Sequence, residues 1–383
     1  MLGWEYPPHI TGGLGTACRA IAAALVRGGT DVTFVLPCLH GDEPRDGVRL
    51  IEARIADVPG AYGTGRTEVS SRRVYQGDLV QTAGRFARAA SETVAADTSA
   101  GERFDVVHAH DWMTYPAGIA AAAASGAPLV VHVHSCEYDR SGTSAAPEIV
   151  AIEQAGFDAA ALIVCVSRYT ADVIEDRYRV DPAKVRVVHN AGPEGAVRGR
   201  RGRRRIPEPV VLFLGRITYQ KGPGVFLAAA ARVARRHADV RFVVAGTGDL
   251  YHRTVEKAAS LGLARRIHFT GFLDAKGVAR AYRDADVYVM PSVSEPFGIA
   301  PLEAAAHGVP VLVSENSGVA EVLPSAVTFD PSDAADLARE LLRVLRSPAL
   351  RRRLASRARR ELSKLGWDAQ AVRLAAVYDE VAR

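Results

Sequence analysis

An arginine and a lysine share one short loop, Gly215–Gly222, which follows the apolar run Val210–Leu214. Arg216 offers a planar fork of N–H donors and Lys221 a compact point charge, a combination that suits a diphosphate. Lys221 is also one of only five lysines in a chain whose positive charge is almost wholly arginine. The alternative is a solvated loop, but a position at the carboxyl end of a strand favours anion binding.

Two carboxylates frame a second loop of this kind. Glu295 and Glu303 follow the apolar run Val287–Met290, and a glycine turn between them leads into a helix predicted at Leu302–His307. The amides predicted to face a phosphate are those of Gly298, Ile299 and Ala300. Carboxylates accept hydrogen bonds from sugar hydroxyls, so the loop suits a ligand with sugars on both sides of a phosphate. Acids also favour helix N-termini for electrostatic reasons alone, which leaves both interpretations open.

A glycine-rich loop, Thr11–Gly15, precedes a helix predicted to begin at about Thr16, and Gly13 lies at its centre. Bare backbone amides at a helix start can bind an anion. The loop is not a dinucleotide fingerprint, because Cys18 stands where the third glycine or alanine belongs and Pro37 stands where a ribose-binding acid is expected. An NAD-linked dehydrogenase is therefore disfavoured.

Paired histidines end two further apolar runs. His108 and His110 precede Asp111, and His132 and His134 close the next run. Alternation along a strand puts the members of each pair on one face, a spacing that resembles that of metal ligands. No further cluster completes a metal site in the sequence, so packed or hydrogen-bonded histidines are favoured.

Asp284 and Asp286 have the spacing of a metal-binding DxD motif, but they lead directly into the apolar run Val287–Met290. We expect one of the two to turn inward at the strand entrance, so that the pair does not converge on one ion. The sequence therefore predicts no metal site.

These side chains must be positioned by short apolar strands that alternate with helices along both halves of the chain. The strands are predicted at residues 32–36, 106–109, 129–133, 162–166, 210–214, 241–245, 267–270, 287–290 and 309–313. This alternation is typical of parallel sheets covered on both faces, so we predict an α/β fold of two doubly wound, Rossmann-like domains facing a central cleft. Only Met1–Gly3 precede the first turn, so the first strand is either truncated or starts upstream.

The predicted domains are residues 1–193 and 209–366, joined by a linker at 194–208. The linker contains an arginine- and glycine-rich run at 198–205 that cannot build a core. Charge runs usually solvate a loop. The alternative is peripheral membrane contact through this run and the arginine-rich helix predicted at 350–362.

Composition limits the class of protein. The chain has 383 residues, of which 48% are hydrophobic and 24% charged, as in an ordinary folded protein. A net charge of +5 is too small over this length to indicate a nucleic-acid binder. The alanine-rich stretch 117–129 is too short for a membrane span and is predicted to be a buried helix. Four cysteines without a CxxC pair, and the lack of a secretory signal, lead us to expect a reduced, cytoplasmic chain.

Together these motifs resemble the retaining glycosyltransferases of the GT-B type, in the family-4 group related to bacterial glycogen synthases. The resemblance covers nearly the whole chain. It rests on the E-x7-E motif from Glu295 to Glu303, the Arg216 and Lys221 pair, the Gly12-Gly13-Leu14 loop, and His134. It also implies that a closing helix at residues 367–383 crosses back to complete the first domain.

The resemblance assigns roles in the second domain residue by residue. Arg216 and Lys221 would bind the diphosphate of a nucleotide sugar, and Glu303 would hold its ribose. Glu295 would contact the donor sugar, helped by the backbone of Gly298, Ile299 and Ala300. The base would lie near Gly271, Phe272 and Leu273.

In the first domain, the resemblance implies that Gly13 approaches the same phosphates. His134 would donate or accept a hydrogen bond at the donor sugar near the reacting carbon. Asp111 would lie beside the sugar or the acceptor, and Glu5 would line the acceptor side.

The activity implied is transfer of a hexose from a nucleotide-diphosphate sugar to a hydroxyl of a glycan, sugar-phosphate or lipid-linked acceptor, with retention and with neither cofactor nor metal. Glycogen synthases carry a lysine where this chain has Ile10, which weakens ADP-glucose and leaves UDP-glucose favoured, with GDP-mannose behind it. The alternatives are a UDP-N-acetylglucosamine 2-epimerase-like enzyme and a nucleotide-sugar-binding subunit without turnover. The oligomeric state is left open.

Overall fold

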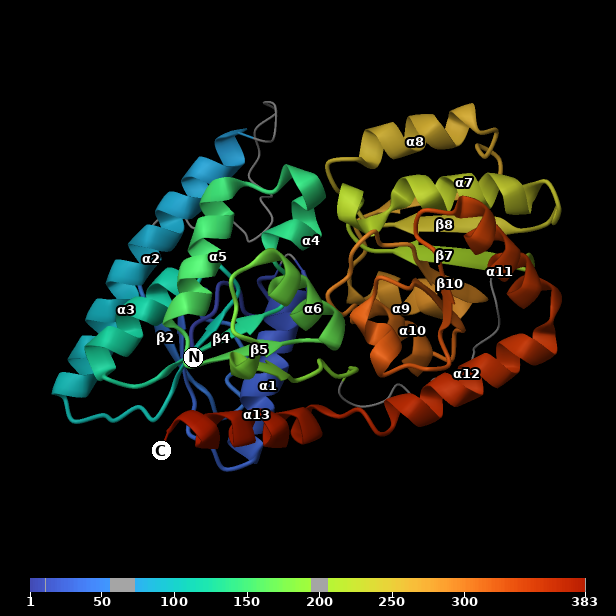
Figure 1. Cartoon of the computed structure of the whole chain (residues 1–383). Coiled ribbons are helices and arrows are strands. Elements are labelled where there is room, and N and C mark those ends of the chain that lie inside the picture. Colours follow the sequence, from blue (N-terminus) through green and yellow to red (C-terminus); the bar gives the residue numbers. More distant parts are fainter. Residues whose placement is uncertain (11, 56–72, 194–205, 383) are drawn as a thin grey trace. The chain divides into compact units, whose positions relative to one another are not determined.

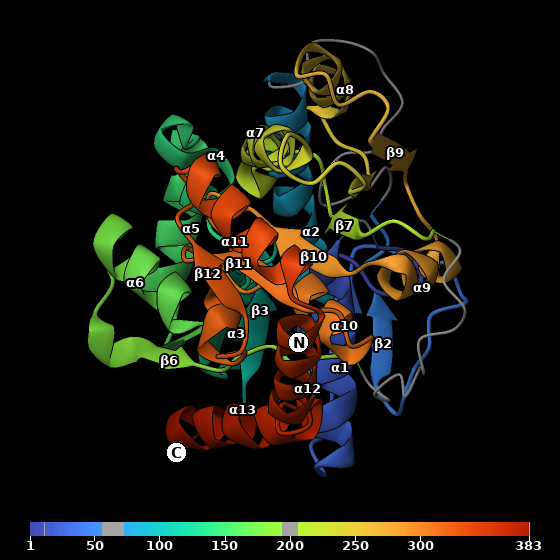
Figure 2. The same cartoon turned by 90° about the vertical axis from the view of Figure 1, so that its right-hand side faces the viewer.

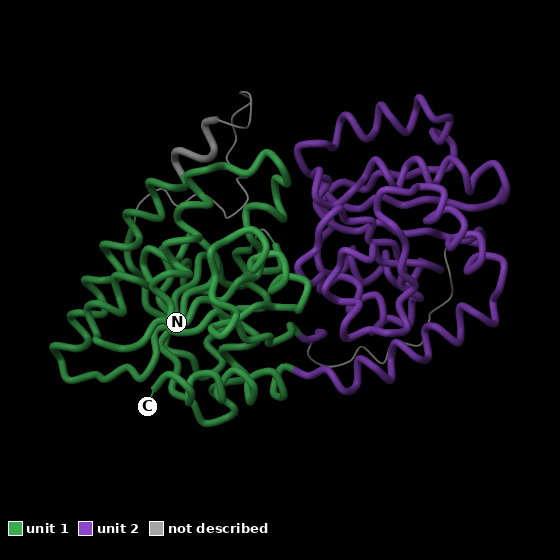
Figure 3. The backbone as a smooth tube through the Cα atoms, viewed as in Figure 1, with its two compact units in different colours: residues 1–190, 367–383 green, residues 191–366 purple. Residues whose placement is uncertain are grey.

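The computed structural model describes residues 1–10, 12–55, 73–193 and 206–382, and for residues 73–78 the backbone alone. The chain forms two compact units (Figure 3). Unit 1 consists of Met1–Asn190 and Trp367–Arg383, and unit 2 of Ala191–Gly366. Most of the predicted linker at 194–208 lies outside the described residues.

Unit 1 is built on parallel strands (Figures 1 and 2). Its strands are β1 (Thr33–Leu36), β2 (Arg49–Glu52), β3 (Val107–His110), β4 (Leu129–Val133), β5 (Leu162–Cys165) and β6 (Val185–Val187). β1 pairs with β2, and β3 to β6 pair in chain order, all in parallel. Leu2 joins the two groups, because it forms parallel bridges to both Val35 and Ala109. The predicted short first strand therefore lies in the middle of this sheet.

Helices cover both faces of the unit 1 sheet (Figure 1). They are α1 (Gly13–Arg27), α2 (Arg73–Ser99), α3 (Tyr115–Ser125), α4 (Glu137–Ser141), α5 (Pro147–Ala159), α6 (Arg168–Arg177) and α13 (Trp367–Val381). α1 packs against α13, while α3 packs against α2 and α5. The stretch 117–129 is not one helix as predicted. α3 ends at Ser125, Gly126 takes a φ of 74°, and β4 begins at Leu129, because a left-handed glycine terminates a helix.

Unit 2 is a six-stranded parallel sheet with the order β12-β11-β10-β7-β8-β9. Its strands are β7 (Val210–Leu214), β8 (Arg241–Ala245), β9 (Ile267–Gly271), β10 (Val287–Met290), β11 (Val311–Ser314) and β12 (Val327–Phe329). Its helices are α7 (Pro223–Ala234), α8 (Tyr251–Ser260), α9 (Ala275–Asp284), α10 (Ala300–Ala306), α11 (Ala334–Arg346) and α12 (Pro348–Leu362). α7 packs against α11, and side chains from β7, β8 and β10 fill the core beneath them.

The prediction of two doubly wound, Rossmann-like parallel sheets is confirmed. Each central strand is buried on both faces, as its apolar sequence requires. Short strands at the flanks, β2, β6 and β12, were not predicted. Among the described residues, no helix combines the length and apolar character needed to span a bilayer.

Candidate active site

The loops after β7 and β10 meet because these strands are neighbours in the unit 2 sheet, and the carboxyl ends of parallel strands lie at one edge. There Lys221 Nζ donates to Glu295 Oε2 at 2.5 Å, and Ser292 Oγ donates to the same oxygen at 3.0 Å. The Glu295 side chain is 8% exposed and that of Lys221 20%. This direct ion pair joins two residues that the sequence analysis had assigned to separate tasks.

Backbone contacts fix both partners of this pair. Glu295 N donates to Asn316 O at 2.9 Å, and Gly318 N donates to Glu295 O at 3.0 Å. The turn carrying Lys221 ends at Gly222, whose φ is 64°. A Cβ at Gly222 would collide with the carbonyl of Pro291, so only glycine allows the two loops to approach this closely.

Glu303 is held differently from Glu295. α10 begins at Ala300, two residues before the predicted start, which puts Glu303 in its first turn. Glu303 Oε2 accepts a hydrogen bond from Tyr282 OH at 2.9 Å, and burial raises the pKa of Glu303. Gly298, at the turn before the helix, has a φ of 94° and lies against Met290. Tyr282 was missed by the sequence analysis, because nothing in its own helix marks it as a partner of Glu303.

The loop that carries Arg216 is tied to the loop after β8. Ile217 N donates to Thr247 O at 2.8 Å, and Leu250 N donates to Ile217 O at 3.0 Å. Gly246 has a φ of 133° and leaves no room for a side chain beside Gly215. The Gly246-Thr247-Gly248 segment thus allows two backbones to approach each other closely. Arg216 itself is half-buried.

Two residues assigned to the base lie after β9. Phe272 is 80% exposed and Leu273 is half-buried. They follow Gly271, which takes a φ of 67° at the strand end. An aromatic ring this exposed offers a face on which a nucleobase can stack.

In unit 1 the two histidines of β3 (His108 and His110), His132 of β4 and His134, which follows β4, form one cluster. His110 lies opposite His132 in the parallel register, so all four rings share one face of the sheet. The rings of His132 and His134 stack with centroids 4.3 Å apart, and those of His108 and His110 are also 4.3 Å apart. α13 adds Tyr378, whose hydroxyl lies 2.6 Å from His108 Nδ1.

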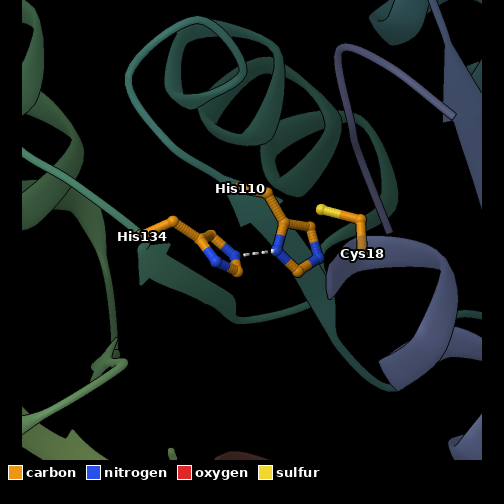
Figure 4. Close-up of side chains that lie close together, drawn as sticks. All are labelled: Cys18, His110 and His134. Carbon is orange, nitrogen blue, oxygen red and sulfur yellow. Dashed lines mark hydrogen bonds between the residues drawn. The ribbon is translucent and has the colours of Figure 1, made fainter. Parts of the chain in front are cut away.

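His110 and His134 share a hydrogen bond between Nδ1 and Nε2, respectively, at 3.0 Å (Figure 4). Figure 4 shows Cys18 of α1 on the far side of His110. Burial lowers the pKa of His134 to about 3 and lowers the pKa of His108, His110 and His132 as well. The rings are therefore neutral at pH 7, and His134 can act as a hydrogen-bonding group without charge.

Asp111 anchors the loop that carries His134. Its φ is 60°, and its Oδ1 accepts from His134 N at 2.7 Å and from Ser135 N at 3.2 Å. Burial raises the pKa of Asp111 to about 6, against the opposing charge of Arg140. The described contacts make Asp111 a positioning residue for His134.

A buried ionic network that the sequence analysis missed holds the same loop from the other side. Arg140 donates to Ser135 Oγ at 2.6 Å, to Glu153 Oε1 at 2.9 Å and to Glu137 Oε2 at 3.3 Å. Glu153 also accepts from Tyr178 OH, and burial raises the pKa of Glu153 to about 7. Arg140 lies on α4 and Glu153 on α5, and no local sequence pattern indicates that these two side chains pair.

Two predicted residues border the start of α1. That helix begins at Gly13, not at Thr16, and Gly13 is exposed at its first position. Glu5 is buried, 7% exposed, and its backbone carbonyl lies close to Gly15 of the helix. The predicted start of the helix was wrong because the glycines begin it without a side-chain cap that the sequence would show.

Metal ligation through Cys18, beside the buried histidines, is disfavoured on chemical grounds. Two groups have ligand atoms within 4.8 Å of one another: Cys18, His110 and His134, and His108, His110 and His132. Burial raises the pKa of the Cys18 thiol, which opposes the thiolate that a metal requires. Asp286, as expected, turns inward at its strand, where it accepts a hydrogen bond from Val210 N at 2.9 Å.

Comparison with known proteins shows the family of the chain. The Glycosyltransferase Family 4 model matches residues 11–191, and the Glycosyl transferases group 1 model matches residues 200–361. The chain is 30% identical to an uncharacterized glycosyltransferase of Methanocaldococcus jannaschii, over 96% of this chain and 94% of that protein. It is also 30% identical to glycogen synthase of Mycobacterium tuberculosis, over 99% of this chain and 93% of that protein.

Among solved structures, sucrose-phosphate synthase from Thermosynechococcus elongatus matches with a TM-score of 0.75 and 21% identity, over 99% of this chain and 98% of that one. The fold is thus of the GT-B class, and the protein is an enzyme that transfers a sugar from a nucleotide sugar. The chain belongs to the family-4 group of glycosyltransferases, related to glycogen synthases.

Proposed function

We propose that the chain transfers a hexose from a nucleotide-diphosphate sugar, with UDP-glucose favoured, to a hydroxyl acceptor with retention of anomeric configuration and without a metal ion. The observation that carries the proposal is the partly buried ion pair between Lys221 and Glu295, at the carboxyl ends of two adjacent strands. A cation and a carboxylate held this way can separate their tasks when a donor arrives. Lys221 would turn to the diphosphate and Glu295 to the sugar hydroxyls.

The chemistry follows from where charge develops. The bond from the anomeric carbon to the diphosphate oxygen breaks, and its electron pair stays on the phosphate, where Arg216 and Lys221 would stabilise it. The sugar becomes cationic, and the acceptor hydroxyl attacks from the face that the phosphate leaves. Because the new bond forms on the face from which the old bond breaks, configuration is retained. The acceptor proton passes to a phosphate oxygen, and no protein nucleophile is needed.

His134 would bind the same donor sugar from unit 1. A neutral ring suits this role, because a positive charge beside the forming sugar cation would raise the energy of the transition state. The low pKa of His134 and its fixed bond to His110 support this part of the proposal. Arg216 and Lys221 supply the positive charge at the leaving group instead.

The acceptor belongs to one of three classes: a glycan, a sugar phosphate or a lipid-linked sugar. Similarity to a glycogen synthase over nearly the whole chain supports a glycan. Ile10, where that group has lysine, supports UDP-glucose over ADP-glucose.

The test is a thermal-shift panel of nucleoside diphosphates, followed by turnover of the preferred nucleotide sugar. Selective binding raises apparent stability by mass action, and we expect UDP to give the largest shift. Slow donor hydrolysis, or transfer with the product anomer unchanged as seen by proton NMR, supports the proposal. Binding without any turnover would identify a non-catalytic subunit, and conversion of UDP-N-acetylglucosamine to its 2-epimer would identify the epimerase alternative.

A further inference from the structure

A third group of potential metal ligands lies outside the site described above. His9 follows the central strand segment of unit 1, and His40 and Glu43 lie in the loop after β1, so all three belong to the carboxyl-terminal edge of the sheet. One ligand atom from each residue lies within 4.8 Å of the others. The rings of His9 and His40 have centroids 3.9 Å apart. Both histidines are exposed and Glu43 is half-buried, so an ion can enter from solvent.

A neighbouring carboxylate orients one of these histidines. Asp42 Oδ1 lies 2.6 Å from His9 Nε2, which holds a proton on that nitrogen and leaves the lone pair on Nδ1. A carboxylate that binds the second nitrogen of a histidine ligand is a recurring feature of metal sites, because it fixes the ring and makes it a better ligand.

The third ligand is also held in place. The Glu43 carboxylate accepts hydrogen bonds from His40 N at 2.6 Å and from Gly41 N at 2.9 Å. Each carboxylate oxygen has more than one acceptor site, so these bonds leave capacity for an ion. The loop is thus ordered around its own potential ligands.

We propose that His9, His40 and Glu43 bind a divalent transition-metal ion, with Zn²⁺ as the expected occupant and Asp42 as the residue that orients His9. Two imidazoles and one carboxylate favour Zn²⁺ over Mg²⁺ or Ca²⁺, which prefer oxygen ligands alone. Three protein ligands leave a fourth tetrahedral position for water or for an oxygen of a bound molecule. The proposal is independent of the proposed sugar transfer, which draws its charge stabilisation from unit 2.

A bound ion would join two loops by coordinate bonds. His9 lies three residues before Gly12, so the ion would tether the chain entering α1 to the loop after β1. Ligand binding to the folded state raises its stability by mass action, so the metal effect has a readout apart from enzymatic activity.

The experiment uses the untagged full chain, stripped of metal and titrated with Co²⁺ as a spectroscopic probe and then with Zn²⁺ in competition with a chromophoric chelator. We expect one ion per chain, the intense visible absorption of tetrahedral Co²⁺, and a rise in melting temperature with Zn²⁺. His9→Ala, His40→Ala and Glu43→Gln should each weaken Zn²⁺ binding by at least about tenfold, and Asp42→Ala by about 10- to 100-fold.

The matched control is His252→Ala, which removes an exposed histidine of α8 in unit 2 and should leave Zn²⁺ affinity unchanged. Circular dichroism of each metal-free variant checks that it folds. The proposal is wrong if the wild-type chain binds no Zn²⁺ at micromolar concentration, or if the four variants bind it as well as wild type does. It is equally wrong if binding is lost with His110→Ala and kept in His9→Ala, since the ion would then belong to the buried histidines.

Discussion

The two units use opposite electrostatics at the loops that end their strands. In unit 2, Lys221 and Glu295 form an ion pair in which Nζ and Oε2 lie 2.5 Å apart. In unit 1, burial lowers the pKa of four histidines, so that His134 and its neighbours stay neutral. In the proposed mechanism, charged side chains would bind the leaving diphosphate and a neutral ring would bind the sugar, which would account for the two residue types on separate units.

The largest effect on the proposed contrast between the units is expected from removing the positive charge of Lys221 in unit 2. Lys221→Ala should lower turnover by roughly 10- to 150-fold, because a charge-assisted contact to the diphosphate contributes about 1.5–3 kcal/mol. Steady-state kinetics at saturating donor measures the loss, and Lys257→Ala, which removes an exposed lysine of α8, is the control. Unchanged turnover in the Lys221 variant would remove this lysine from the mechanism.

The neutrality of unit 1 is open to a pH test through His132, whose ring nitrogens have no hydrogen-bond partner within the described part of the chain. Burial lowers the pKa of His132 in the folded chain. Below about pH 6.5, His132 is therefore protonated in the unfolded chain but stays neutral in the folded chain. The stability tied to this group is present above that pH and is lost as the pH falls. His132→Leu should therefore reduce the acid sensitivity of unit 1 by up to about 1.4 kcal/mol per pH unit.

Urea unfolding between pH 7.5 and 5.5, followed by tryptophan fluorescence, measures this slope. All three tryptophans, Trp4, Trp112 and Trp367, belong to unit 1, so the signal reports on that unit. His268→Leu, at an exposed position of unit 2, should leave the slope as it is. An identical slope in the His132 variant would show that this ring takes up its proton in the folded state as well.

His134→Ala tests whether the neutral ring of unit 1 contributes a hydrogen bond to the donor sugar. Loss of one neutral hydrogen bond, about 0.5–1.5 kcal/mol, should lower transfer by roughly 2- to 12-fold. UDP affinity, measured by calorimetry, should stay nearly intact, because the proposal assigns the diphosphate contacts to Arg216 and Lys221 of unit 2. Equal losses of UDP affinity and of transfer would instead indicate a structural role for His134.

The smallest expected effect concerns metal. Because the proposed mechanism takes the positive charge at the leaving group from Arg216 and Lys221, it predicts that EDTA leaves the transfer rate unchanged. The measurement is initial velocity in chelated buffer against buffer with added Mg²⁺ or Zn²⁺. A strict requirement for either ion would contradict the metal-free mechanism.

Local patterns were enough to predict the central strands and the loops that follow them. β4, β7, β8 and β10 lie at the predicted residues, because apolar side chains dominate each strand and most of its residues are buried. The flanking strands β2, β6 and β12 escaped prediction, since they are short and only partly buried. The start of α1 was placed three residues late, because glycines gave no side-chain signal for it.

Contacts between distant parts of the sequence were not predictable. Tyr378 reaches His108 from 270 residues away, and Tyr282 reaches Glu303 from the preceding helix. Lys221 and Glu295 were each chosen correctly as chemical groups of interest, but their pairing depends on β7 and β10 being neighbours. A sequence pattern can therefore indicate which residue types carry the chemistry, but the order of strands in the sheet determines which of these residues come into contact.

A crystal structure of the protein soaked with UDP tests the central claim most directly. We predict that the Lys221–Glu295 pair opens and that Lys221 Nζ and the Arg216 guanidinium both lie within hydrogen-bond distance of the diphosphate. A diphosphate bound elsewhere, with Lys221 still paired to Glu295, would contradict the account.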